Sequence, residues 1–253
     1  MKLRFLGTGT SNGVPVIGCT CKVCKSNNAK DKRLRTSALL ETETTRILID
    51  CGPDFRQQIL PVPYKKIDGI LITHIHYDHV GGIDDLRQFS WLSDLEIYAN
   101  KDTCQGLRHN FPYCFKEHLY PGVPKLNLHT IVPHKAFSIG NCTVTPIEVM
   151  HGKMPIMGYR IGNFSYITDM KTINNTELSY LKGVDTLVVN ALRWEKEHHS
   201  HQLIDDAIAF SRTIKAKQTY LTHLTHEIGL HEEAKQRLPK NFYFAYDGLE
   251  IEV

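Results

Sequence analysis

Short apolar runs alternate along the chain with turn residues and with stretches of helical periodicity. Apolar runs of strand length predict β-strands at 3–6, 38–40, 46–50, 69–73, 96–99, 143–149, 157–161, 164–168, 186–190, 219–222 and 242–245. Segments of helical pattern predict helices at 53–60, 83–89, 101–109, 176–181, 202–215 and 231–238. The segment 202–215 is the clearest of these, because its apolar residues fall on one face of a helix.

The order of these elements favours mixed β-sheets with helices on their outer faces. The runs 157–161 and 164–168 flank Gly162-Asn163, which is typical of a β-hairpin. No linker, low-complexity tract or clear repeat divides the 253 residues, so we expect one domain over 1–253. The pattern by itself leaves open whether the strands form a sandwich or a single doubly wound sheet.

Composition indicates an ordinary globular chain. Hydrophobic residues make up 42% and charged residues 23%, and the net charge of +3 is too small to attract nucleic acid by itself. The N-terminal apolar run is too short for a signal peptide, and no stretch approaches the roughly 18–20 apolar residues that span a bilayer. We therefore expect a cytoplasmic protein with no membrane partner.

Four potential metal ligands lie within six residues, in the segment THIHYDHVGG at 73–82. His74, His76, Asp78 and His79 follow the apolar run 69–72, at the end of a predicted strand. Imidazole and carboxylate groups bind zinc and similar divalent ions, and burying them without partners is costly. The segment therefore indicates a metal site, with a solvated histidine-rich loop or a mononuclear structural site as the alternatives.

A second cluster contains three of the seven cysteines. Cys19, Cys21 and Cys24 have the spacing C-x-C-x₂-C, which in a reducing compartment favours metal binding over disulfides. Structural zinc takes four ligands, and His226 is the candidate for the fourth. The alternative is three free thiols and a surface histidine.

The pattern H-x-H-x-D-H after an apolar strand resembles the signature of the metallo-β-lactamase superfamily. This resemblance implies an αββα sandwich, in which two mixed β-sheets are flanked by helices. It implies a dinuclear site with His74, His76 and His151 on one metal, Asp78, His79 and His223 on the other, and Asp169 bridging both. Asp50, in the run LIDCG, either orients a ligand by a hydrogen bond or forms a turn.

Three further segments narrow the resemblance. The opening GTGTSNGVP at 7–15, the cysteine cluster and RLRTS at 33–37 resemble the branch of phosphoribosyl cyclic phosphodiesterases of the carbon–phosphorus lyase pathway. That branch implies a Cys₃His zinc site and a catalytic histidine, which we match by position to His201, with His198 and His199 as alternatives. Ribonuclease Z shares the dinuclear motif but lacks this cysteine cluster, and it usually has a basic, glycine-rich arm that this sequence does not show.

The resulting hypothesis is a dinuclear metal-dependent phosphodiesterase. It would cleave a small cyclic phosphate or nucleotide-like phosphodiester through a metal-bridging hydroxide, with Asp78 and His201 in catalytic roles. The expected cofactors are two ions of zinc, manganese or iron and one structural zinc; the expected partner is a small molecule and not nucleic acid. The oligomeric state is open, a homodimer included. The alternatives are an RNA 3′-processing endonuclease, a lactonase or thioesterase, and a metal-dependent oxidoreductase of the same superfamily.

Overall fold

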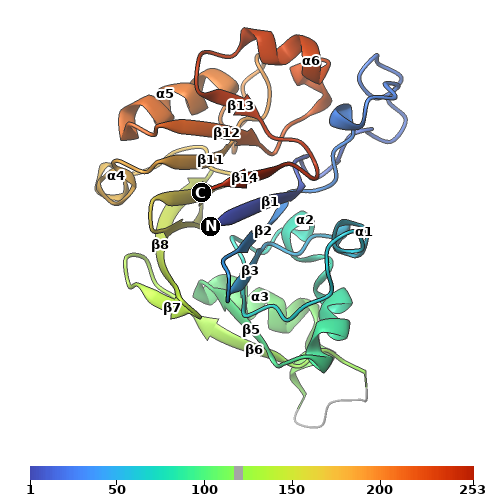
Figure 1. The fold of residues 1–253 in the computed structure, drawn as a ribbon, viewed down its shortest axis with the longest axis vertical. Helices are drawn as coiled ribbons and strands as arrows, with labels where there is room; N and C mark the ends of the chain where they lie inside the picture. Colours follow the sequence, from blue (N-terminus) through green and yellow to red (C-terminus); the bar gives the residue numbers. More distant parts are fainter. Residues whose placement is uncertain (117–121) are drawn as a thin grey trace.

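Two seven-stranded β-sheets pack against each other in the computed structural model, which describes residues 1–116 and 122–253 (Figure 1). The first sheet has the order β14 (Glu250–Glu252), β1 (Lys2–Gly7), β2 (Ser37–Glu41), β3 (Arg46–Ile49), β4 (Gly69–Leu71), β5 (Leu95–Ala99) and β6 (Leu126–Thr130). The second has the order β13 (Phe242–Phe244), β12 (Gln218–Thr222), β11 (Thr186–Asn190), β10 (Phe164–Ile167), β9 (Met154–Ile161), β8 (Cys142–His151) and β7 (Phe137–Ile139).

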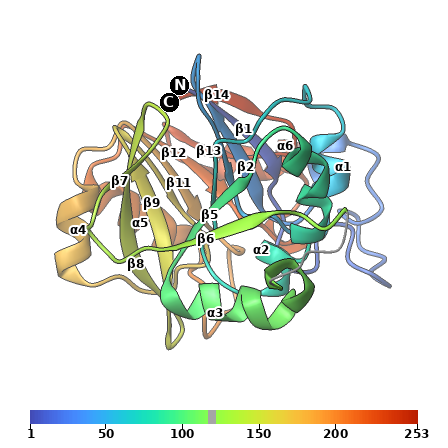
Figure 2. The ribbon, with the colours of Figure 1, turned by 90° about the horizontal axis from the view of Figure 1, so that it is seen from below.

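Helices cover the outer face of each sheet (Figure 2). The α-helices are α1 (Phe55–Ile59), α2 (Tyr77–Val80), α3 (Lys101–Asn110), α4 (Asn175–Leu181), α5 (Ile204–Ile214) and α6 (His231–Ala234). The 3₁₀-helices are η1 (Ala29–Asp31), η2 (Ile83–Trp91), η3 (Pro112–Phe115), η4 (His226–Ile228) and η5 (Lys235–Arg237). Phe55 of α1 and Leu107 of α3 pack on the first sheet, and Leu181 of α4 and Ile208 of α5 pack on the second. This arrangement confirms the αββα sandwich.

Both sheets follow the same pattern of strand directions. From β14 to β3 and from β7 to β10 the neighbouring strands are antiparallel, and from β3 to β6 and from β10 to β13 they are parallel. β3 and β10 therefore occupy the same place in their sheets. Each is followed by an aspartate with a positive φ, Asp50 at 59° and Asp169 at 58°. Two equivalent acidic turns thus end at one rim of the sandwich.

The inner core joins the two sheets through alternating strand residues. Leu40 and Ile47 of the first sheet pack with Met157 and Phe164 of the second, and all four are fully buried or nearly so. Burial of such side chains stabilises the fold by about 1.5–3 kcal/mol each. The Tyr159 hydroxyl donates to the Ile72 carbonyl oxygen at 2.6 Å, which links the end of β4 to the opposite sheet.

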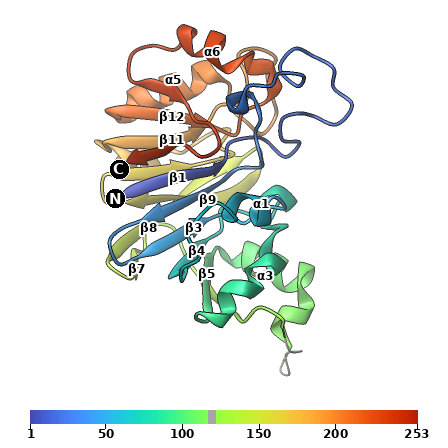
Figure 3. The ribbon, with the colours of Figure 1, turned by 45° about the vertical axis from the view of Figure 1, so that its right-hand side comes forward.

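The N-terminal loop, residues 8–36, packs against the C-terminal part of the chain beside α6 (Figure 3). Its anchor is Arg33, which is buried and donates hydrogen bonds to the Thr8 hydroxyl and the Ala245 carbonyl oxygen, both at 2.7 Å, and to His231 Nδ1 at 3.3 Å. Burial lowers the pKa of Arg33 to about 10, while the nearby Asp247 raises it, so the guanidinium stays charged at neutral pH.

We expect Arg33→Met to lower the free energy of unfolding by about 3–5 kcal/mol, because it leaves buried acceptors and carboxylates without their cation. Urea unfolding of the two proteins measures the difference. The matched control is Arg35→Met, since Arg35 pairs with Asp54 at 3.0 Å with 31% of its own side chain exposed, and such pairs contribute about 1 kcal/mol or less. Equal losses in the two variants would contradict a special role for Arg33.

Among the described residues, no helix combines the length and the apolar character that crossing a membrane requires.

Candidate dinuclear metal centre

The predicted ligands gather at one rim of the sandwich. His74 and His76 follow β4, and Asp78 and His79 lie on the short helix α2 directly after them. On the other sheet, the three remaining ligands stand at strand ends: His151 is the last residue of β8, Asp169 follows β10, and His223 follows β12. Asp169 and His223 both have positive φ values, 58° and 56°, so the chain turns sharply where each ligand leaves its strand.

Three histidines form the first group. The ligand nitrogens of His74, His76 and His151 lie within 4.8 Å of one another. His74 Nε2 and His76 Nδ1 are 2.9 Å apart, and the ring of His151 lies 5.4 Å from that of His74 and 5.1 Å from that of His76 between centroids. The sequence assignment of these residues to one ion is compatible with this geometry.

The second group contains Asp78, His79, Asp169 and His223, whose ligand atoms also lie within 4.8 Å of one another. His79 Nε2 is 3.3 Å from Asp78 Oδ2 and 3.4 Å from Asp169 Oδ1. His223 Nε2 is 3.2 Å from Asp169 Oδ2, which is itself 4.0 Å from His74 Nε2 of the first group. The carboxylate of Asp169 therefore stands between the two groups.

The donor atoms fit divalent cations. His79 Nε2 and both ring nitrogens of His223 are buried and have no hydrogen-bond partner in the described part of the chain. Burial alone would raise the pKa of Asp169, but the neighbouring His223 and His79 hold it well below its usual range. Nitrogen and carboxylate donors of this kind suit zinc, manganese or iron. Cations at this rim would give these buried nitrogens the partner that they lack.

Asp50 orients His79 by a hydrogen bond and is not itself a member of either ligand group. Its fully buried carboxylate accepts hydrogen bonds from His79 Nδ1 at 2.7 Å, from the Thr73 hydroxyl at 2.9 Å and from the Thr73 N–H at 2.8 Å. The bond to Nδ1 turns His79 Nε2 toward Asp78 and Asp169. Of the two sequence alternatives for Asp50, the hydrogen-bonding acceptor is the one that this geometry favours.

Two orienting contacts were not anticipated from the sequence. The Thr168 hydroxyl donates to Asp169 Oδ1 at 2.7 Å, and His151 Nδ1 donates to the Asp169 carbonyl oxygen at 2.7 Å. The first bond orients the Asp169 carboxylate, and the second orients the His151 ring so that Nε2 faces the centre. A threonine immediately before a ligand, as in Thr73-His74 and Thr168-Asp169, is the signal that the sequence offered for such contacts.

Of the three loop histidines, His201 borders the ligands. Its Nδ1 lies 3.8 Å from Asp169 Oδ2, and its ring stacks on His223 at 4.8 Å and meets His151 edge-on at 4.7 Å. Burial, followed by the nearby His223, lowers the pKa of His201 to about 2, so the ring is neutral near pH 7. His198 lies behind it at 5.0 Å, and His199 is exposed and stacks on His198.

The cysteine cluster is also assembled. The three sulfur atoms of Cys19, Cys21 and Cys24 lie 3.3, 3.4 and 3.2 Å from His226 Nδ1. The Cys24 N–H donates to Cys21 Sγ, which lowers the pKa of Cys21 to about 6 against the opposing effect of burial. A thiolate near neutral pH, two further thiols and one imidazole form the donor set of a structural zinc site.

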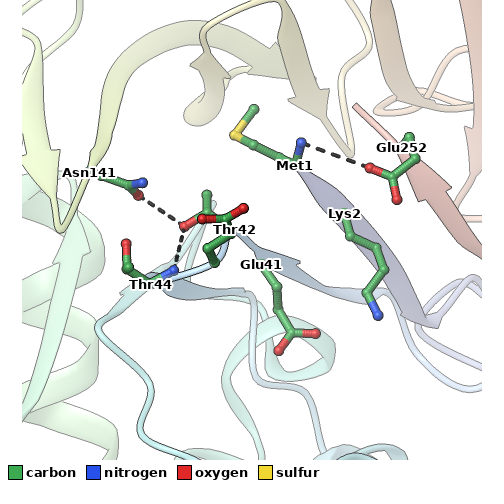
Figure 4. A pocket seen from close by; sticks show the side chains of 8 residues that line it. Met1, Lys2, Glu41, Thr42, Thr44, Asn141 and Glu252 are labelled. Atoms are coloured by element: carbon green, nitrogen blue, oxygen red, sulfur yellow. Dashed lines mark hydrogen bonds and ion pairs between the residues drawn. The ribbon is translucent and has the colours of Figure 1, made fainter.

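A polar hollow of about 600 Å³ lies at the other end of the first sheet (Figure 4). Among the residues that line it are Met1, Lys2, Glu41 and Asn141. Lys2 and Glu41 are neighbours in the register of β1 and β2, at the opposite end of these strands from Gly7 and Ser37. Its described lining contains no histidine or cysteine. Among the described residues, the side-chain groups that could hold a metal ion lie at the opposite rim and in the cysteine cluster.

The sequence of the chain matches a known superfamily. A model of the β-lactamase superfamily domain matches residues 45–224. The chain belongs to this superfamily. The superfamily resemblance seen in the sequence is therefore confirmed. The matched segment contains all seven predicted ligands of the dinuclear centre.

A diphosphatase from the PhnP family has a crystal structure that superposes with a TM-score of 0.91 at 38% identity, covering 99% of this chain and 96% of that chain. An octanoyltransferase of Porphyromonas gingivalis is 45% identical over 251 residues, which cover 99% of this chain and 51% of that protein. A ribonuclease Z of Bacillus subtilis is 34% identical over 168 residues, covering 64% of this chain and 48% of that protein. The chain thus spans about half the length of the curated relatives it matches.

Proposed function

We propose that residues 1–253 form one domain of a dinuclear metal-dependent phosphodiesterase, which acts on a small cyclic phosphate or nucleotide-like phosphodiester. The observation that carries this proposal is the convergence of seven imidazole and carboxylate ligands, with His201 at their edge. The similarity to a diphosphatase over nearly the full length of both chains supports a phosphorus-containing substrate.

In this proposal His74, His76 and His151 would hold one divalent ion, Asp78, His79 and His223 the other, and Asp169 both. Such ions bring the pKa of a bound water from about 15.7 toward about 7 and offset negative charge on phosphoryl oxygens. Zinc, manganese and iron all suit these donors, and the cysteine cluster would hold a structural zinc.

The side chains of the protein would orient the ligands and assist the departing group. Asp50 holds His79 so that Nε2 faces the centre, and Thr168 does the same for the Asp169 carboxylate. His201 turns Nδ1 toward Asp169, which leaves Nε2 for the departing oxygen of the substrate. A hydrogen bond from the neutral ring of His201 would stabilise that oxygen as the bond to phosphorus breaks.

RNA 3′-processing is the second candidate, because relatives named ribonuclease Z are 30–34% identical over 167–168 residues. Those matches cover only 64% of this chain. We do not extend octanoyl transfer to this chain, since the assembled side chains suit a metal site and a structural relative that matches over nearly the full length of both chains is a diphosphatase.

A substrate panel tests the proposal. Protein loaded separately with zinc, manganese or iron would be assayed on cyclic and linear small phosphodiesters, a lactone, a thioester and precursor tRNA, with oxygen consumption followed for the iron form. We expect the small phosphodiesters to give the highest kcat/KM. Preference for precursor tRNA, for a carbon ester or for oxygen chemistry would reject the proposed substrate class. A protein that binds none of the three ions and cleaves none of the substrates would reject the metal centre.

A further inference from the structure

The loop that carries the three histidines has no regular structure between β11 and α5. We refer to residues 192–202 as the histidine loop. Its two ends are held together by the Leu192 N–H, which donates to the Gln202 carbonyl oxygen at 3.1 Å, and its base is closed by the Ile204 N–H and the Arg193 carbonyl oxygen at 3.0 Å. These bonds close the loop, and the Gln202 N–H also donates to the Met170 carbonyl oxygen at 3.1 Å, next to Asp169 in the chain. The N-terminal half of the loop is held by other contacts.

Those contacts come from the short segment after His223. The Thr225 N–H and hydroxyl donate to the Leu192 carbonyl oxygen at 3.0 and 3.1 Å. The indole N–H of Trp194 donates to the Ile228 carbonyl oxygen at 3.0 Å. The histidine loop is therefore bonded to both ends of η4, the helical turn that begins at His226.

Glu227 supplies the charged part of this attachment. One carboxylate oxygen accepts a bond from Arg193 Nη1 at 2.5 Å, and the other accepts one from Lys196 Nζ at 3.1 Å. Arg193 Nε also donates to the Lys196 carbonyl oxygen at 2.9 Å. The Arg193 side chain is 18% exposed and that of Glu227 30% exposed, so this pair lies at the surface, on the outer side of the loop.

The neighbouring residue faces the other way. His226 directs Nδ1 to the sulfur atoms of Cys19, Cys21 and Cys24, while Glu227 directs its carboxylate to the histidine loop. Because the two residues are consecutive in a single 3₁₀ turn, a displacement of His226 moves Glu227 with it. The cysteine cluster and the histidine loop are thus joined through one turn of helix.

We propose that the Cys19–Cys21–Cys24–His226 cluster, acting through Glu227 and Ile228, holds the histidine loop in the position that places His201 against His151 and Asp169. Glu227 is then a positioning residue for the reaction. The attachment itself is independent of the substrate, and only its effect on turnover rests on the proposed function. Misplacing a reacting group by about 1 Å can cost about 10²-fold in rate, so a small shift of this loop has a large effect.

Trp194 reports the attachment without any activity measurement. The chain has two tryptophans, so Trp91→Phe leaves Trp194 as the single fluorophore. In that background we expect Cys21→Ser to change the emission maximum and raise acrylamide quenching of Trp194, because the loss of a cluster ligand frees η4. Glu233→Gln is the matched control. Glu233 forms an exposed ion pair with Lys22, which lies between Cys21 and Cys24, and this pair involves neither η4 nor the histidine loop. An unchanged Trp194 spectrum in Cys21→Ser would overturn the proposal.

Glu227→Gln tests the coupling with the cluster intact. We expect kcat to fall about 10-fold or more with KM little changed, while bound metal and thiol reactivity stay at the wild-type level. In a His201→Ala background the same substitution should change kcat by less than about 2-fold, because a positioning residue has no effect once its target is removed. An equal loss in both backgrounds, or unchanged kcat in the single variant, overturns the proposal. Failure of the wild-type protein to cleave phosphodiesters would instead reject the proposed function, and the Trp194 result would still decide the attachment.

Discussion

Asp169→Asn is expected to deplete the metal centre and nearly abolish turnover. One oxygen of this carboxylate lies 3.4 Å from His79 Nε2, and the other lies 3.2 Å from His223 Nε2 and 4.0 Å from His74 Nε2. An amide offers one weak oxygen donor and no charge, so neither group of histidines retains a shared ligand. Removing a single charge-stabilising group already costs about 10²–10³ in kcat, and we expect a larger loss here. Elemental analysis of the purified protein and steady-state kinetics measure both effects.

Asp50→Asn is the informative comparison for this variant. Asp50 follows the equivalent strand of the other sheet with nearly the same φ, but within residues 1–116 and 122–253 its carboxylate accepts hydrogen bonds from Thr73 and His79 Nδ1 alone. We expect it to lose about 10–100-fold in metal affinity or activity, as for partners that orient a ligand. If Asp169→Asn kept the wild-type metal content, or if the two variants behaved alike, a bridging role for Asp169 would be wrong.

Much of the centre could be predicted because its ligands follow apolar strands. The runs before His74, His151, Asp169 and His223 read as buried strands, and strands that end at the same rim bring their next residues together. The relation between Asp50 and Asp169 was not visible in the sequence. It depends on the two sheets having the same order of antiparallel and parallel neighbours, and long-range pairing of this kind leaves no local pattern.

The sequence did not predict α2, β6, β7 and β14, and two of these strands have weak periodicity. β6 has the sequence LNLHT and is largely exposed beyond Leu126, and β14 is the three residues EIE, so neither shows a clear apolar alternation. The helix expected at 83–89 is the 3₁₀-helix η2, whose buried residues Ile83, Leu86 and Phe89 recur every three positions. That spacing matches three residues per turn and not 3.6. The expected helix at 231–238 is divided between α6 and η5.

The identity of the proposed catalytic histidine is the part of the site that the sequence determines least. Three histidines within four residues offer the same chemistry, and only the path of the histidine loop distinguishes them. That path depends on a bond to Met170 and on contacts with Thr225, Glu227 and Ile228, all outside the loop. Position matching favoured His201, and the structure brings that ring, and not those of His198 or His199, against His223 and His151.

His201→Ala is expected to keep the metal content and lower kcat by about 10²–10⁴-fold on an alkyl phosphodiester, the usual contribution of general acid–base catalysis. The physical reason is that an alkoxide leaves poorly without a proton or hydrogen bond, whereas a nitrophenolate leaves without help. The loss should therefore be much smaller on a bis-nitrophenyl phosphodiester, and the ratio of the two losses is the measurement. His199→Ala is the matched control, because that exposed ring stacks only on His198 among the rings described. Equal losses on both substrates, or loss of metal from the variant, would make His201 a ligand or a packing residue and not the group that assists the departing oxygen.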